Sequence, residues 1–277
     1  MASIAGGFIL PHEPGIFHMP PDRWTDGQRR VRAAYDRVAQ RIGELQATTV
    51  IVVGADHYVL FGPGCLPSYL IGIGDVSGPY ERFPGIDQGE IPNNRPLARH
   101  IAQYGGEHGF DWAVAKSIRV DHSIGVPARL CALPNASVKA VVPVYLASGV
   151  EPLIPMRRAY ALGAQIREAV EAWPEDERVV VIGSGGISHW VGLPEMGKVN
   201  TEFDRWVLDC VERGDPEPMM RLTDAEVFER GGNGAYEIRN FLCAMGALRG
   251  GKGSVIAYEH GPEWVTGLGF AELTEAA

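Results

Sequence analysis

Residues 178–190 read RVVVIGSGGISHW, a run of β-branched residues that ends in a glycine-rich turn and then a histidine. A continuous apolar run of this length, bounded by turn residues, is typical of a strand buried on both faces. Residues 48–57, TTVIVVGADH, show the same succession of features. We therefore expect residues 178–183 and 48–54 to form buried strands of one sheet.

Strand and helix patterns alternate along most of the chain. Further strands are expected at residues 68–72 and 138–146, with weaker candidates at 3–10 and 254–258. Apolar periodicity predicts helices over residues 26–46, 96–104, 155–173, 201–213, 223–230 and 234–248. Residues 72–95 are the clearest loop. The alternation predicts an α/β fold in which residues 1–277 form a single domain, with a central mixed β-sheet flanked by helices and an active site in a cleft at the strand ends.

The composition argues against several function classes. Of the 277 residues, 45% are hydrophobic and 21% are charged, as in ordinary globular proteins. No apolar run approaches the roughly 20 residues of a membrane helix, and the N-terminal residues lack a signal-peptide pattern, so we expect a cytoplasmic protein without a membrane partner. The formal net charge of −9 argues against nucleic acid and favours a small-molecule partner.

Four of the eight histidines directly follow predicted strands, namely His12, His57, His122 and His189. In open α/β sheets, ligands bind beyond the carboxyl ends of the strands, so side chains placed there converge. One such histidine alone is more often an ordinary hydrogen-bonded loop residue. Four together predict a shared site.

Two aspartates stand directly before site histidines, Asp56 before His57 and Asp121 before His122. A carboxylate that is hydrogen-bonded to an imidazole fixes its tautomer and orientation. Adjacent residues need not face each other, however, and both aspartates could equally cap turns. The sequence leaves the two roles open.

A metal site for oxygen chemistry needs an acid as well, since non-haem iron(II) is typically held by two histidines and one carboxylate. Glu237 is the best candidate, because it shares a helical face with apolar residues such as Phe241 and Leu248, where an isolated carboxylate is costly to bury. The alternative is an ordinary acid in the first turn of a helix, where the helix dipole favours it. The competing acids are Glu13, Glu259 and Asp204.

Five segments, GGFILPHEPG, GADHY, DHSIGVP, VVVIGSGGISHW and ERGGNGAYEIRNFLCAMGAL, occur in this order between residues 6 and 248. Each motif is short, but the ordered set is specific. The chain resembles the type III extradiol dioxygenases of the LigB superfamily, in particular the catalytic subunits of protocatechuate 4,5-dioxygenase and the gallate dioxygenases.

The resemblance implies a role for each candidate residue. It implies that Fe(2+) is bound by His12, His57 and Glu237, that His122 and His189 handle protons and oxygen, and that Thr266 in EWVTGLGF contacts the substrate. The implied reaction opens the ring of a catechol-type aromatic, such as protocatechuate, gallate or a related diol or aminophenol. Dioxygen supplies both added oxygen atoms, and the product is a semialdehyde or its equivalent.

The implied partners are a small aromatic substrate and O2, but the substrate class stays open. No counterpart of the family's carboxylate anchors is recognisable, and the candidates for meeting a substrate carboxylate are Lys252, Arg239 and Thr266. Protocatechuate enzymes use a small helical subunit to cap the site. Here we expect either such an accessory subunit or closure by the loop at residues 72–95, and a homo-oligomer is a further expectation. His18 and His260 lie in predicted loops and are candidates for the pocket rim.

Two alternatives belong to other function classes. A zinc hydrolase would use the same three ligands to activate water. A non-enzymatic interaction protein would keep part of the metal pocket, although the presence of all five implied site residues argues against it. Iron quantification and oxygen uptake distinguish these alternatives from the dioxygenase.

Overall fold

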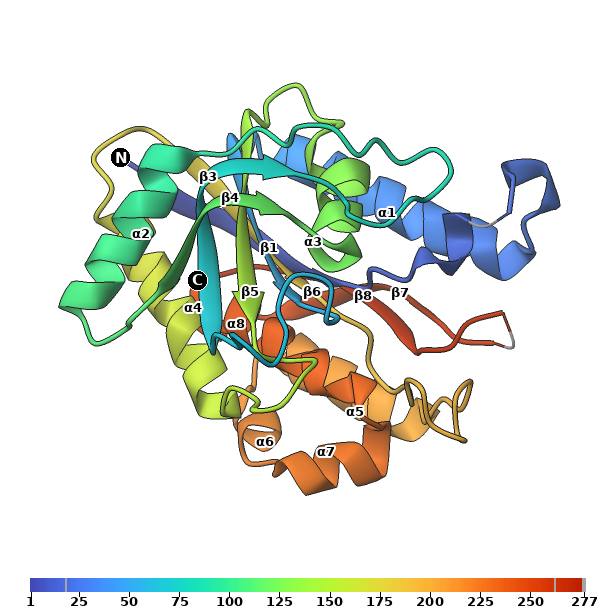
Figure 1. The fold of residues 1–277 in the computed structure, drawn as a ribbon. Helices are drawn as coiled ribbons and strands as arrows, with labels where there is room; N and C mark the ends of the chain where they lie inside the picture. Colours follow the sequence, from blue (N-terminus) through green and yellow to red (C-terminus); the bar gives the residue numbers. More distant parts are fainter. Residues whose placement is uncertain (18, 262, 276–277) are drawn as a thin grey trace.

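The predicted strands lie in one sheet in the computed structural model, which describes residues 1–17, 19–261 and 263–275 (Figure 1). Within these residues the sheet has eight strands in the order β4-β3-β5-β2-β6-β1-β8-β7. Their bounds are β1 Ser3–Leu10, β2 Thr49–Ala55, β3 Tyr69–Ser77, β4 Ala113–Arg119, β5 Ala140–Leu146, β6 Arg178–Ser184, β7 Gly253–Glu259 and β8 Leu268–Leu273.

The four central strands run in the same direction. β2 pairs in parallel with both β5 and β6, and β6 pairs in parallel with β1. β3 pairs antiparallel with β5 and parallel with β4, while β8 and β7 continue the sheet antiparallel beyond β1. The carboxyl ends of β1, β2 and β6 therefore lie side by side at one edge of a mixed sheet.

Helices cover both faces of the sheet. Helices α2, α4, α5 and α8 pack on one face, and α1, α3 and the π-helical turn Ala128–Ala132 pack on the other. Side chains alternate along β2, because Ile51 and Val53 belong to the first core whereas Val50 and Val52 belong to the second. The helix bounds are α1 Asp26–Glu44, α2 Arg95–Glu107, α3 His122–Pro127, α4 Met156–Glu171, α5 Thr201–Arg213, α6 Glu217–Met220, α7 Asp224–Gly231 and α8 Ile238–Ala247, and 3-10 turns occur at Pro14–Phe17, Pro21–Arg23 and Gly234–Glu237.

The predicted α/β fold with a central mixed sheet flanked by helices is confirmed, with local corrections. β4 and β8 are strands that the sequence pattern did not indicate. The loop expected at residues 72–95 starts later, because β3 continues through Ser77 and pairs there with Arg119 of β4. The helix expected at residues 234–248 is divided into the 3-10 turn Gly234–Glu237 and α8.

The structure also bears on the expected membrane segments and on His18. In the described part of the chain, no helix is both long enough and apolar enough to cross a membrane. His18, a candidate for the pocket rim, lies outside the described residues.

Candidate active site and metal centre

The site lies at the carboxyl ends of the central parallel strands. His12 follows β1, His57 follows β2, and residues 184–189 continue from β6, the strand between them. Glu237 is the last residue of the 3-10 turn that precedes α8, and it is buried against the start of the segment after β6. The strand-end rule thus brings these residues together as predicted.

The carboxylate of Glu237 lies between two imidazoles. Its Oε1 atom is 3.2 Å from Nε2 of His12 and 3.2 Å from Nε2 of His57. Oε1 is buried, and no described residue gives it a hydrogen bond of acceptable geometry, whereas Oε2 accepts the backbone N–H of Gly186 at 2.8 Å. An unpaired acceptor in such a place is costly unless another group binds it. Two imidazole nitrogens and one carboxylate oxygen therefore converge as a metal ligand set would.

Hydrogen bonds at the other ring nitrogens orient both imidazoles. His12 Nδ1 lies 2.8 Å from Oγ of Ser184, at the end of β6. His57 Nδ1 lies 2.8 Å from Oδ2 of Asp121, and the other carboxylate oxygen, Oδ1, caps α3 by accepting the backbone N–H of Ser123. With Nδ1 engaged in both rings, each Nε2 is directed at Glu237, an arrangement common in metal sites.

Charges in this cluster are strongly coupled. Burial alone would raise the pKa of Glu237, but the adjoining imidazoles of His12 and His57 outweigh it and hold the pKa well below its ordinary value. Burial lowers the pKa of His57, yet the carboxylates of Asp121 and Glu237 raise it well above the usual value. For Asp121, burial is outweighed mainly by His57, and the pKa falls to about 2.

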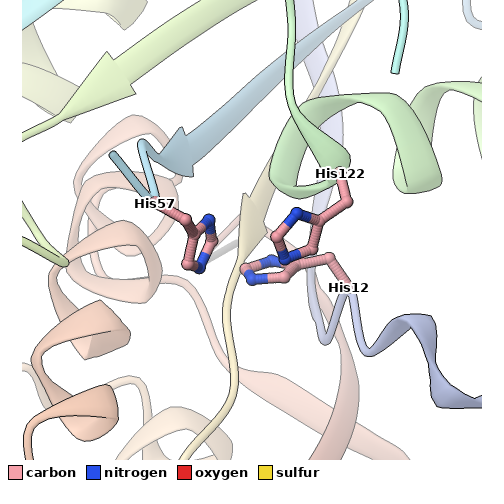
Figure 2. Close-up of side chains that lie close together, drawn as sticks. All are labelled: His12, His57 and His122. Carbon is pink, nitrogen blue, oxygen red and sulfur yellow. The ribbon is translucent and has the colours of Figure 1, made fainter. Parts of the chain in front are cut away.

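His122 joins the cluster from a different direction. It begins α3 after β4, a strand antiparallel to the central ones, so the strand-end rule does not explain its position. Its ring nevertheless stacks on His57, with centroids 4.3 Å apart, and lies 5.1 Å from the ring of His12 (Figure 2). One nitrogen of each of the three imidazoles lies within 4.8 Å of the corresponding nitrogens of the other two. Burial and the neighbouring histidines outweigh the carboxylate of Glu81 and lower the pKa of His122.

His189 is the last residue of the segment after β6, and its side chain is buried. Its Nδ1 lies 3.2 Å from Oγ1 of Thr266 and 3.3 Å from the carbonyl oxygen of Ile187. A Cβ on Gly234 would lie 2.1 Å from His189 Nε2, so a glycine is required where the 3-10 turn approaches the ring. Burial lowers the pKa of His189 despite the charge of Glu237, which leaves the ring neutral near pH 7.

The two aspartates that precede histidines have different contacts. Asp56 accepts the backbone N–H groups of Leu60 and Phe61, so its contacts match the turn-capping alternative. Asp121 does contact a site histidine, but that histidine is His57 and not its neighbour His122. Among the competing acids, Glu259 pairs with Arg30, Glu13 accepts the backbone N–H of Gly15, and Asp204 is buried behind residue 188.

The two basic candidates for a carboxylate anchor do not reach the site. Arg239 is fully buried and donates to the carbonyl oxygens of Ile154 and Tyr236 and to Asp224. Lys252 lies beside Thr274, at the opposite end of the β7–β8 pair from Thr266. The expectation that Lys252 or Arg239 meets a substrate carboxylate is therefore wrong. The hydroxyl of Thr266 is the one member of that set beside a site histidine.

Sequence reasoning missed two side chains that form hydrogen bonds with site histidines. Ser184 was visible in the glycine-rich turn of GSGG but was not singled out, although it orients His12. Glu81 lies in the loop after β3, where no periodic pattern points to it, and its Oε1 is 2.7 Å from His122 Nδ1.

Comparison with known proteins agrees with this geometry. The model of the LigB family, described as the catalytic LigB subunit of aromatic ring-opening dioxygenase, matches residues 6–269. A 2,3-dihydroxyphenylpropionate/2,3-dihydroxicinnamic acid 1,2-dioxygenase of Rhodococcus globerulus is 26% identical and covers 90% of this chain and 91% of its own. The Burkholderia vietnamiensis enzyme of the same name is 28% identical and covers 96% of each chain.

A solved structure shares the fold. The crystal structure of an uncharacterized protein from Escherichia coli K12 matches with a TM-score of 0.58 at 12% identity, over 97% of this chain and 99% of that one. At this identity the likeness concerns the fold alone. The family match, which spans most of the sequence, shows that the chain belongs to the LigB family and is an aromatic ring-cleavage dioxygenase of the extradiol type.

Proposed function

We propose that residues 1–277 form one catalytic domain that uses iron(II) and O2 to open a catechol ring carrying a side chain, the substrate class for which its relatives are named. The observation that carries the proposal is the position of Glu237 Oε1, buried without a hydrogen-bond donor and 3.2 Å from Nε2 of both His12 and His57. Two imidazoles and one carboxylate on one face, with positions left for other ligands, are the typical donor set for iron(II) that reacts with oxygen.

In this proposal His12, His57 and Glu237 hold the metal. Ser184 and Asp121 keep the two imidazoles oriented, and the backbone N–H of Gly186 keeps the carboxylate oriented. When bound, iron(II) supplies the Lewis acidity that lowers the pKa of the substrate hydroxyls and the redox couple through which the catechol reduces O2.

His189 is proposed as the residue that moves protons. A general base must be unprotonated near the working pH, and the lowered pKa of the buried ring meets that condition. It would accept the proton of the second substrate hydroxyl and return it as the ring opens. Thr266 Oγ1, 3.2 Å from Nδ1, would hold the ring or touch the substrate. His122, stacked on His57, would position O2 beside the ligand residues.

The ring substituent is the least determined part of the substrate. The relatives are named for substrates with a carboxylate side chain, but neither Lys252 nor Arg239 is available here. A buried unpaired carboxylate is costly, so we propose an uncharged substituent or one whose charge stays in solvent. Equal kcat/KM for 3-methylcatechol and 3-(2,3-dihydroxyphenyl)propionate would agree with this, and a strong preference for the acid would contradict it.

The test is anaerobic reconstitution with Fe(II) or Zn(II), followed by a panel of catechols, gallate, protocatechuate and 2-aminophenol. Oxygen uptake, ring-fission absorbance and incorporation of labelled oxygen would be recorded. We expect turnover with Fe(II) only, with both atoms of O2 in the product. Absence of oxygen uptake with every compound in the Fe(II)-loaded protein would refute the proposal.

A second ligand set is favoured by one observation. The three imidazoles of His12, His57 and His122 lie close enough to bind a metal together, and three histidines are a familiar zinc site. In such a set His122 would take the place of Glu237 among the ligands. Metal content separates the two sets: loss of metal in Glu237→Ala but not in His122→Ala supports the iron site, and the reverse pattern supports the histidine set.

A further inference from the structure

The loop after β3 carries an acid into contact with His122. Glu81 Oε1 lies 2.7 Å from His122 Nδ1, and both side chains are largely buried. The second oxygen, Oε2, is buried and has no hydrogen-bond partner among the described residues. This is the same kind of contact that Asp121 makes with His57, but it comes from the loop at residues 78–94 that follows β3.

Two side chains hold this loop in place. The side-chain amide of Gln88 donates to the carbonyl oxygens of Pro79, Tyr80 and Glu81, at 3.2, 3.3 and 2.8 Å. Arg129, in the π-helical turn after α3, donates to the carbonyl oxygens at residues 78, 89 and 90 and pairs with the carboxylate at position 87. These hydrogen bonds hold the backbone around Glu81 in place, so that its carboxylate is positioned beside His122.

We propose that Glu81 is a positioning residue for ring cleavage: it accepts the Nδ1–H of His122 and thereby fixes the tautomer in which Nε2 is free to accept in the pocket. A neutral imidazole carries one proton on either nitrogen, and an ionised carboxylate can only accept. The contact therefore selects Nδ1–H. The inference rests on the proposed function for its effect on turnover, but the tautomer itself exists without metal or substrate.

Glu81 reaches His122 from a loop of the same chain. A purely structural role for Glu81 is the competing explanation. In that case its loss would loosen the loop without changing which nitrogen of His122 carries the proton.

The first arm of the test reads the tautomer in metal-free protein labelled with 15N-histidine, using long-range 1H–15N spectra at one fixed neutral pH. The signal of His122 is assigned from His122→Asn. The wild type should show Nδ1–H. Glu81→Gln should show it too, because the amide oxygen can accept while the amide nitrogen occupies the place of the unpartnered Oε2. Glu81→Ala should shift His122 toward Nε2–H.

The second arm uses the Fe(II)-loaded enzyme. We expect Glu81→Ala to lower kcat by roughly 10- to 100-fold with its iron retained and KM little changed, the usual scale for residues that orient a site group. Glu81→Gln should recover most of the loss. Glu90→Gln, which removes an exposed charge from the same loop, should match the wild type in both arms.

An unchanged Nδ1–H signal in Glu81→Ala would overturn the proposal, as would equal loss of kcat in the Ala and Gln variants. Failure of the proposed function looks different, because the tautomer shift would then remain while no variant, nor the wild type, consumed oxygen.

Discussion

Replacing Asp204 with asparagine should change how stability depends on pH. Asp204 is fully buried in α5, and its carboxylate accepts the backbone N–H of Ser188 at 2.8 Å and the hydroxyl of Tyr258 at 2.7 Å. A Cβ on Gly267 would lie 1.8 Å from Oδ2, so the carboxylate packs tightly against the backbone at Gly267. Gly267 in turn donates its N–H to the carbonyl oxygen of Ser188, the neighbour of His189. Burial outweighs these hydrogen bonds and raises the pKa of Asp204 from 3.8 to about 6.

The magnitude follows from that shift. A rise of roughly two pKa units corresponds to about 3 kcal/mol, at about 1.4 kcal/mol per unit. Because the folded state keeps its proton to a higher pH than the unfolded state, the free energy of unfolding falls as pH rises from about 4 to about 6. Above that range both states are ionised and the full cost is present. Asparagine has no proton to lose, so Asp204→Asn escapes this cost.

The assay is urea unfolding of the wild type and Asp204→Asn in EDTA, between about pH 4.5 and 7.5, with the difference in unfolding free energy plotted against pH. We expect the difference to move in favour of asparagine by about 2 kcal/mol across this range, because about 1 kcal/mol of the full effect has already developed below pH 4.5. Asp209→Asn, which removes an exposed carboxylate from the same helix, is the control and should give a much flatter line. A flat line for Asp204→Asn, or a slope of opposite sign, would refute the reasoning.

Three further predictions concern the reaction. Glu237→Ala should lose most bound iron and all turnover because it removes one of three ligands, and full iron occupancy by mass spectrometry would eliminate Glu237 as a ligand. His189→Gln should keep its iron and anaerobic substrate binding while kcat falls by roughly 10²–10⁴-fold; loss of iron would place His189 among the ligands. Gly234→Ala should fold but lower kcat to a similar degree, because its Cβ would lie 2.1 Å from His189 Nε2 and must displace the ring; wild-type kcat would contradict that contact.

The sequence predicted the parts of the fold that are buried on both faces. β2 and β6 are continuous β-branched runs with every residue but Arg178 buried, so their pattern is unmistakable. β4 lies at the edge of the sheet, with half-buried and exposed positions interleaved in AVAKSIR and few large apolar residues. Edge strands take much of their definition from the neighbouring strand, which a sequence window does not contain.

The site residues that follow parallel strands could be predicted, whereas contacts between residues far apart in the sequence could not. His12 and His57 follow β1 and β2, parallel strands on either side of β6, as the strand-end rule predicts. His122 arrives at the N-terminus of α3, and its neighbour Asp121 contacts a histidine 64 positions away, which no local pattern encodes. The burial of Asp204 could have been predicted, because this acid lies within the apolar stripe of α5.

Residues 184–189 hold several parts of the site at once. Ser184 contacts His12, the N–H of Gly186 contacts Glu237, and the segment ends in His189. A substitution there would alter metal affinity and proton transfer together, so variants of this segment should seldom be useful to an engineer. Libraries that aim at new substrates should instead keep Glu81 and vary the rest of the loop at residues 78–94, which approaches His122 from outside that frame. Residues 184–189 are thus the part of the site that natural or laboratory evolution must keep, whereas the loop around Glu81 is a part that it can exchange.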